Sequence, residues 1–371
     1  MMMKLGEIIT QIRGVSYKPS DVRAAGDPDA VALLRANNIQ EDGLNFDDLV
    51  WVDKQKVGAE QYLRLGDILI CSSSGSKGLV GKAAIVTSDL SCAFGAFCKV
   101  VRTKAEYASY LGQFFRSPRY RKEISASAAG ANINNIRNEH IDEMFISMPS
   151  ANERAGCVAK LGQIDYLIQK INNQSHQLDQ LVKSRFVEMF GEPTINSKNW
   201  KRVRFDSLCE NLDGKRRPIT STDREAGPYP YYGASGIVDH VAGFIFDEDI
   251  LLVSEDGANL LARSTPIAFS VSGKVWVNNH AHVLRFNNFA LQKYVEYYFS
   301  MISIEDYITG STQPKLNQAK LNCMMIPLPS DSLQEVFMRF VAEIDKSKLA
   351  VKQSLEKLET LKKSLMQQYF G

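Results

Sequence analysis

The chain has 371 residues, a formal net charge of +2, and 44% hydrophobic and 23% charged residues. This length exceeds what one hydrophobic core usually supports, so two domains are expected, and the small net charge excludes a broadly cationic nucleic-acid-binding surface. Since no apolar run is long enough to cross a membrane and the first residues do not form a signal peptide, we expect a cytoplasmic protein.

The first predicted domain covers residues 1–149. Its clearest strand, within GDILICSSSG at 66–75, runs into a polar loop, and a second polar loop precedes residue 136. Serine, asparagine and lysine side chains on such loops can reach phosphates or the edges of bases. They also close turns and cap helices, so a structural role is expected for part of the set. The candidates for DNA contact are Ser72, Ser73, Ser74, Lys77, Asn132, Asn134 and Asn135.

Residues 150–191 are predicted to form one long helix. It opens at Pro149-Ser150, a suitable cap region, and ends at Phe190-Gly191, because glycine commonly follows the last turn of a helix. Apolar residues recur at alternating spacings of three and four, the pattern of a helix-pairing seam. The seam consists of Leu161, Ile164, Ile168, Ile171, Leu178 and Val182, with Ser175 as its polar exception.

The second predicted domain covers residues 192–329. Its strand segment EDILLVSEDG at 248–257 answers GDILICSSSG, and HVLR at 282–285 answers KVVR at 99–102. The candidates for DNA contact are again in polar loops: Lys215, Arg216, Arg217, Tyr231, Tyr232, Asn278, Asn279, Gln313, Lys315 and Asn317. Basic clusters within 198–217 and 116–122 suit phosphates, although a solvated surface explains them equally well.

Residues 330–371 are predicted to form a second long helix, which opens at Pro329-Ser330 and ends at Phe370-Gly371. Its seam consists of Val341, Ile344, Val351, Leu355, Leu358 and Leu365, and Lys348 and Lys362 fall on the same face. Neither helix can bury its seam on a small domain alone, so we expect the two helices to pack on each other.

An internal repeat connects the two halves. Residues 130–191 and 310–371 align without gaps at an offset of 180, with thirteen identities in 62 positions. Average composition would give about four by chance. Duplicated halves favour an antiparallel helix pair, with one domain at each end and an approximate two-fold axis between them.

The order of these segments resembles that of specificity subunits of type I restriction–modification systems. The resemblance covers essentially the whole chain. It is strongest in GANINNIRNEHIDEMFISMPS at 130–150 and GSTQPKLNQAKLNCMMIPLPS at 310–330, the loop and strand that lead into each long helix. WKRVRFDSLCENLDGKRRPI at 200–219 resembles the start of a target-recognition domain. YPYYGASGIVDHV at 229–241 resembles a segment of one branch of these domains and has no clear sequence counterpart in the first domain.

The resemblance implies a mixed α+β fold: two similar α/β target-recognition domains separated by a pair of long, antiparallel, coiled-coil-like helices with pseudo-two-fold symmetry. Each domain would read one half of a bipartite site in double-stranded DNA. The helices would set the gap between the halves and dock two methyltransferase subunits, which restriction subunits join. S-adenosylmethionine, ATP and magnesium would belong to these partners. Two alternatives remain open: the recognition subunit of a related type II methyltransferase–nuclease system, and a two-domain adaptor that binds protein or sugar.

The residues themselves predict no catalysis, cofactor or metal. The chain has no adjacent prolines, so it lacks the N-P-P-Y motif with which adenine methyltransferases hold a flipped base. The stretch from Gly75 to Ala83 has the wrong spacing for a phosphate-binding loop. The acidic residues 247–249 and 255–256 are expected to be solvated loops. His280 and His282 have no apparent third ligand, and the six cysteines form no C-x-x-C pair.

Overall fold

The computed structural model describes residues 1–76, 78–127, 134–310 and 312–371. Two of the predicted DNA contacts, Lys77 and Asn132, lie outside these residues. The chain divides into two compact units, which we call unit 1 (Met1–Asn173 with Lys352–Gly371) and unit 2 (Gln174–Val351). Each unit combines one predicted domain with part of each long helix.

Unit 1 contains a four-stranded antiparallel sheet in the order β2-β9-β5-β7 and a three-stranded sheet in the order β4-β3-β8. Two short antiparallel ladders, β1-β11 and β10-β6, complete its strands. The strands are β1 (Met2–Lys4), β2 (Ile9–Arg13), β3 (Ala30–Leu34), β4 (Val50–Asp53), β5 (Ile68–Cys71), β6 (Ser73–Ser74), β7 (Ala83–Ile85), β8 (Ala93–Phe94), β9 (Cys98–Thr103), β10 (Asn134–Asn135) and β11 (Phe145–Ser147). Its shorter helices are α1 (Ala105–Phe114), α2 (Pro118–Ser127) and α3 (Asn138–Asp142).

Unit 2 contains a four-stranded antiparallel sheet in the order β13-β20-β17-β18, a mixed sheet in the order β15-β14-β19-β16, and the ladder β12-β21. The strands are β12 (Arg202–Arg204), β13 (Cys209–Asn211), β14 (Ala226–Gly233), β15 (Gly236–Val241), β16 (Phe246–Asp247), β17 (Ile250–Ser254), β18 (Ala268–Val271), β19 (Lys274–Val277), β20 (Ala281–Phe286) and β21 (Met325–Pro327). Its shorter helices are α5 (Asn259–Ala262), α6 (Phe289–Met301) and α7 (Gln318–Asn322).

The two units share one topology, which confirms the prediction of two similar domains. In the antiparallel four-stranded sheet of each unit a central apolar strand, β5 or β17, pairs with the strand that carries KVVR or HVLR. In the second sheet of each unit a strand of an antiparallel pair runs parallel to a later strand, β3 beside β8 and β14 beside β19. The β3–β4 hairpin is therefore the topological counterpart of β14–β15, although the sequence of 229–241 has no visible match in unit 1.

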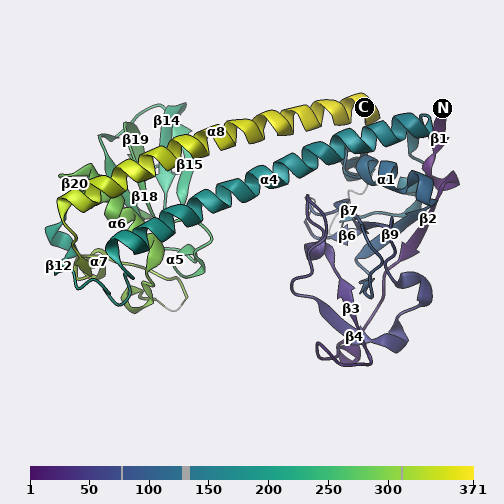
Figure 1. Ribbon diagram of the computed structural model, residues 1–371, viewed down its shortest axis with the longest axis horizontal. Helices are drawn as coiled ribbons and strands as arrows, with labels where there is room; N and C mark the ends of the chain where they lie inside the picture. Colours follow the sequence, from purple (N-terminus) through teal and green to yellow (C-terminus); the bar gives the residue numbers. More distant parts are fainter. Residues whose placement is uncertain (77, 128–133, 311) are drawn as a thin grey trace. The chain divides into compact units, whose positions relative to one another are not determined.

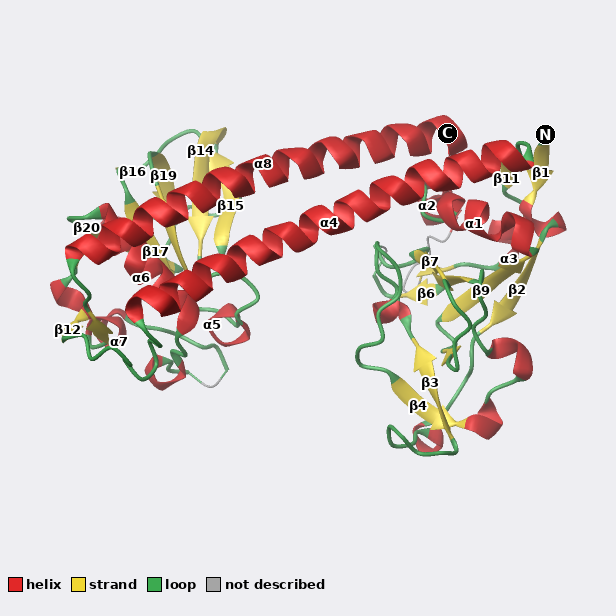
Figure 2. Cartoon of the chain, viewed as in Figure 1, coloured by secondary structure: helices red, strands yellow, loops and turns green. Residues whose placement is uncertain are grey.

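Helix α1 covers one face of the unit 1 sheet by packing on β7 and β9, and α6 packs on β17, β18 and β20 in the same way. In Figure 2 the four-stranded sheet of unit 1 lies between helices α1–α3 and the β3–β4 hairpin. All residues of β5 and β17 are buried, because both faces of these central strands are covered. Their continuous apolar sequences are typical of such strands.

The two long helices are α4 (Ala151–Phe190) and α8 (Asp331–Phe370), as predicted. Ser150 caps α4 through a reciprocal capping box, since its N–H donates to the Glu153 carboxylate at 2.9 Å while the Glu153 N–H donates to the Ser150 Oγ at 3.4 Å. Gly191 adopts a positive φ of 83°, which only glycine tolerates easily, and its N–H closes the last turn onto Val187. No helix in the described parts of the chain combines the length and apolarity needed to cross a membrane.

The seams of α4 and α8 face each other in antiparallel register. In unit 1 Lys362 Nζ lies 2.7 Å from Asp165 Oδ1, and in unit 2 Lys348 Nζ lies 2.5 Å from Asp179 Oδ1. From residue 165 to residue 179 of α4, the partner on α8 changes from residue 362 to residue 348. The two positions are equally far apart on both helices, so the helices run antiparallel. Every predicted seam residue is buried or half-buried. The two lysines that interrupt the apolar seam of α8 are the residues that make these cross-helix ion pairs. Figure 1 shows the ribbons of α4 and α8 that carry them.

The final phenylalanine of each long helix completes the core of one unit. Phe370 packs on Tyr110 in unit 1, with ring centroids 5.2 Å apart, and Phe190 packs on Tyr294 in unit 2 at 4.9 Å. The two tyrosines are equivalent, because the Tyr110 hydroxyl donates to the carbonyl of Ser147 and the Tyr294 hydroxyl donates to that of Pro327, residues related by the repeat. The repeated Phe-Gly is therefore both a helix stop and a core anchor.

Candidate nucleic-acid interface

In unit 1 the predicted polar loops meet at the end of β5. The Ser72 N–H donates to the Phe97 carbonyl in the loop between β8 and β9, and the Ile136 N–H donates to the Ser72 carbonyl. Beyond this point Ser73 pairs with Asn135 and Ser74 with Asn134 in the β6–β10 ladder. The structure thus brings together the described members of the predicted set in this domain.

Unit 2 repeats the arrangement with different side chains. The Glu255 N–H donates to the His280 carbonyl, the Leu316 N–H donates to the Glu255 carbonyl, and Asp256 bridges to Lys315. These bonds make Glu255 the equivalent of Ser72, and Lys315 the equivalent of Asn135. The sequence alignment at an offset of 182 matched Ser72 with Ser254, and the hydrogen-bond register corrects this by one residue.

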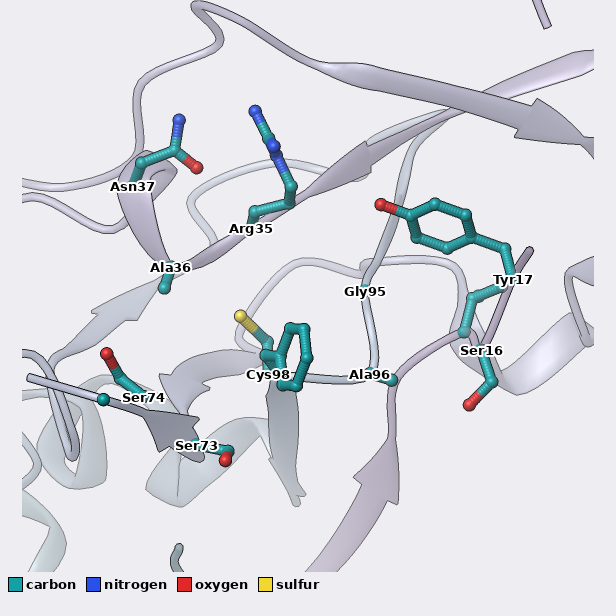
Figure 3. A pocket seen from close by; sticks show the side chains of 13 residues that line it. Ser16, Tyr17, Arg35, Ala36, Asn37, Ser73, Ser74, Gly95, Ala96 and Cys98 are labelled. Atoms are coloured by element: carbon teal, nitrogen blue, oxygen red, sulfur yellow. The ribbon is translucent and has the colours of Figure 1, made fainter. Parts of the chain in front are cut away.

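A groove beside this junction in unit 1 has a volume of about 700 Å³. Figure 3 shows Arg35 and Asn37 on one wall and Ser73 and Ser74 on the facing wall, with the Tyr17 ring at one end. Arginine and asparagine are the side chains that most often read guanine and adenine, so this wall has the chemistry of base recognition. The exposed ring of Phe97, 70% accessible, lines the same groove and offers an apolar surface to a base.

Arg35 is held in place for such a contact. One terminal nitrogen donates to both the carbonyl and the carboxylate of Asp48 at 2.7 Å. Its Nε is buried and has no hydrogen-bond partner among the described residues.

A smaller cavity of about 370 Å³ adjoins the groove, since Ala96 and Cys98 line both. Its polar lining includes Arg13, Lys99 and Asn135. Lys99 is only 7% exposed, and its Nζ donates to Gln11 Oε1 at 2.9 Å and to Asn138 Oδ1 at 2.8 Å. Burial lowers the pKa of Lys99 to about 8, and the carboxylates of Asp142 and Glu139 oppose part of this shift.

At the equivalent junction unit 2 contains a buried network of ion pairs. Arg216 Nη1 lies 2.6 Å from Glu255 Oε2, and Lys315 Nζ lies 3.1 Å from Glu255 Oε1. The buried His282 ring faces Asp213 at 2.6 Å and donates toward the Leu316 carbonyl at 2.8 Å. Burial opposes ionisation of Asp213 and Glu255, but hydrogen bonds from His282 and Arg216, respectively, keep the pKa of each carboxyl below its ordinary value.

Asp213, Glu255 and His282 lie close enough to share a metal ion. The sequence had suggested no third ligand near His282, so the fold corrects that expectation about which residues come together. Both oxygens of Glu255 already contact cationic side chains, and His282 uses both ring nitrogens within the protein. The cluster therefore has the character of an internal ion network that fastens the recurring loop to β20.

Several predicted contact residues are engaged inside the fold. Tyr231 is 1% exposed and its hydroxyl accepts from the Ile219 N–H, so its ring is a core residue. The side chains of four others also bond within the protein: Ser72 to the Phe97 carbonyl, Asn278 to the His280 N–H, Arg216 to Glu255, and Asn317 to the Lys320 N–H as the cap of α7. Lys215, Arg217, Asn279, Gln313 and Lys315 are exposed, and Tyr232 is half-buried.

The basic cluster predicted at 116–122 is mostly structural. Arg116 pairs with Asp165 at 2.8 Å, Arg119 donates to the Phe370 and Phe145 carbonyls, and Arg121 donates to the Val80 and Gly78 carbonyls. These guanidinium groups bind a carboxylate of α4 and carbonyls of β11, of the end of α8 and of the turn at 78–80. They leave few donors for phosphate.

Sequence reasoning missed the residues that give unit 1 its most suitable surface: Arg13, Tyr17, Arg35, Asn37, Phe97 and Lys99. One signal was available, because a lysine at the start of the apolar strand KVVR aligns with a histidine in HVLR, and both are buried. Nothing local marks the others, since β2, the segment after β3 and the loop between β8 and β9 bring them together only in the folded unit.

Comparisons with known proteins agree with this architecture. A family model for the type I restriction modification DNA specificity domain matches residues 197–361. The type I restriction enzyme EcoKI specificity subunit of Escherichia coli (strain K12) is 28% identical over 408 residues, which cover 98% of this chain and 86% of that protein. The chain is therefore similar to type I restriction–modification specificity subunits along nearly its whole length.

Other specificity subunits match in part or in fold. The StySPI specificity subunit of Salmonella potsdam is 38% identical over 175 residues, covering 47% of this chain and 37% of that protein. A solved S subunit of a type I system from M. genitalium aligns over 100% of this chain and 96% of its own, with a TM-score of 0.57 and 15% identity, which supports the fold. Specificity subunits are the DNA-recognition components of these systems and are not themselves catalytic.

Proposed function

We propose that this specificity subunit recognises a bipartite site in double-stranded DNA, with unit 1 and unit 2 each reading one half. The observation that carries the proposal is the repeated junction of a strand end, the loop before β9 or β20, and the recurring loop, which appears once in each unit with different side chains. Two domains with the same backbone arrangement but different polar side chains can read two different half-sites.

The proposal includes the assembly. The paired helices α4 and α8 dock two methyltransferase subunits and set the gap between the half-sites, and restriction subunits join this core in the cytoplasm. S-adenosylmethionine, ATP and magnesium bind to those partners. The cross-helix pairs Asp165–Lys362 and Asp179–Lys348 support a fixed register between the helices.

The gap is the property to test. We would insert four residues after Asn173 in α4 and four after Gln353 in α8, which lengthens both helices by about 6 Å and leaves both ion pairs intact. Methylated adenines mapped in a host that carries the variant and its methyltransferase partner should then lie about two base pairs farther apart.

Insertion into α4 alone is the matched control. It adds the same residues but shifts Asp165 and Asp179 out of register with their lysines, so it should reduce stability without defining a new gap. An unchanged gap in the double insertion, with methylation retained, would refute the role of the helices in spacing. If the unaltered complex methylated no specific sites, the proposed recognition of a bipartite DNA site would be refuted.

A further inference from the structure

The polar cavity of unit 1 lies where unit 2 has an internal salt bridge. Lys99 occupies the same ladder position as His282, because Lys99 pairs across its sheet with Ile70 and His282 pairs with Val253 in the equivalent strands. Ser72 is likewise the equivalent of Glu255. In unit 2 the Glu255 carboxylate thus pairs with the neighbouring cations Arg216 and Lys315. Unit 1 has the Ser72 hydroxyl at the equivalent position.

The cations of unit 1 lack an anionic partner at this place. No carboxylate lines the 370 Å³ cavity within the described residues, whereas Arg13 and Lys99 both do. The exposed guanidinium of Arg13 makes no ion pair or hydrogen bond in the described part of the chain. Lys99 donates to two amide oxygens, which leaves its third N–H without a protein acceptor. Asp142, the nearest carboxylate of α3, accepts instead from the Gln11 amide at 2.7 Å.

We propose that this cavity binds one phosphate of the DNA backbone, held by Arg13 and Lys99, and that Glu255 fills the equivalent place in unit 2. The inference rests on the proposed function and deepens it. A phosphate contact here would position the adjoining groove, with Arg35 and Asn37, against base edges, because phosphate contacts fix the register of a protein on the duplex. Unit 2 would take its phosphate contacts elsewhere.

The first test removes the exposed cation. Arg13→Gln in the full chain, assembled with its methyltransferase partner, should weaken binding to cognate and non-cognate duplexes by a similar factor, about 5- to 10-fold near 0.1 M salt. It should also reduce the slope of log affinity against log salt by about 1, the value for one lost phosphate contact. Lys104→Gln, an exposed lysine of the same unit that lines neither cavity, is the charge-matched control and should leave the slope unchanged.

The second test introduces at position 72 of unit 1 the carboxylate that unit 2 has at Glu255. Ser72→Glu places a carboxylate beside Lys99, and Ser72→Gln has the same size without the charge. The glutamate variant should bind DNA several-fold more weakly than the glutamine variant and show the smaller salt slope. Thermal melting of each variant verifies the fold. If neither Ser72 variant folds, the Arg13 series decides the question.

The pH dependence gives an independent readout. The groups that face Lys99 are Arg13 and Gln11 of β2, and Asn138, Glu139 and Asp142 of α3. Since the pKa of Lys99 is about 8, it is charged at pH 7 and loses its charge by pH 9, so DNA affinity should fall over this interval. Lys99→Arg keeps its charge, and the fall should be smaller in that variant.

Three outcomes overturn the inference while leaving the proposed function intact. Arg13→Gln could bind with wild-type affinity and salt slope. It could lose discrimination between sequences without a change in slope, which would indicate base reading. Finally, millimolar inorganic phosphate could raise the melting temperature of the wild type but not of Arg13→Gln, with equal DNA affinity, which would indicate a free-anion site. Failure of the wild-type complex to bind any duplex would instead refute the proposed function.

Discussion

At the end of β5, unit 1 has Ser72 beside Arg13 and Lys99, whereas at the end of β17 unit 2 has Glu255 bonded to Arg216 and Lys315. The backbone hydrogen bonds around the two positions are the same. The same backbone arrangement therefore carries an open basic cavity in unit 1 and a closed network of ion pairs in unit 2. Two domains with one topology can differ most in the side chains of their loop junctions, because the sheet and the helix ends maintain the shared backbone.

The largest expected effects test whether the ends of α4 and α8 play equivalent roles in the cores of the two units. Phe190→Ala and Phe370→Ala should each lower the free energy of unfolding by about 3–4 kcal/mol, because each removes a buried ring from an aromatic cluster. Chemical unfolding gives the magnitude. Hydrogen exchange should place the loss in unit 2 for Phe190 and in unit 1 for Phe370.

Leu181→Ala and Leu361→Ala are the matched controls for that pair. They are also related by the repeat, but their side chains are 47% and 48% exposed, so each should cost well under 1 kcal/mol. Strongly unequal losses for the two phenylalanines would show that the ends of α4 and α8 do not play equivalent roles.

The contrast in charge predicts a pH-dependent difference. Glu255→Gln should lower stability at pH 7 by about 2 kcal/mol, because it leaves Arg216 and Lys315 without their carboxylate. The folded pKa of Glu255 is lowered, so its contribution is present above the unfolded pKa, near 4.3, and is lost as pH falls through the folded value. The difference between wild type and variant should therefore shrink below pH 4.

Ser72→Ala is the corresponding change in unit 1. It removes one hydrogen bond, from Ser72 Oγ to the Phe97 carbonyl at 3.0 Å, and should cost about 1 kcal/mol with no change between pH 7 and pH 3. Urea unfolding at both pH values measures both variants. A pH-independent loss in Glu255→Gln would argue that the network is held by packing rather than by charge.

The smallest expected effects concern the seam. Asp165 contacts both Lys362 and Arg116, whereas Asp179 contacts Lys348. Asp165→Asn should therefore cost about 1 kcal/mol and Asp179→Asn about 0.5 kcal/mol, since partly exposed ion pairs are weak. Thermal melting should show both losses diminishing at 1 M salt. Equal losses, or losses insensitive to salt, would contradict this assignment.

Much of the fold could be predicted because its signals are local or repeated. The seam from Leu161 to Val182, the cap at Ser150 and the Phe-Gly stops depend on spacing along one helix. The offset of 180 revealed the duplication. The candidate site was predicted less well: Ser73, Ser74 and Asn135 do meet at one junction, but Tyr231 is buried and Arg216 belongs to an ion network. Burial and pairing depend on segments far apart in the chain.

The sequence alone determined the duplication, the two long helices, the seam residues and the family resemblance, because each follows from periodicity or from the order of motifs. Only the tertiary structure decided that Ser72 is the counterpart of Glu255, that Arg13, Lys99 and Asn135 line one cavity, and that β3–β4 matches β14–β15. These relations depend on the hydrogen-bond register between strands. Register is a long-range property, since a slip of one residue changes every partner without changing the local pattern.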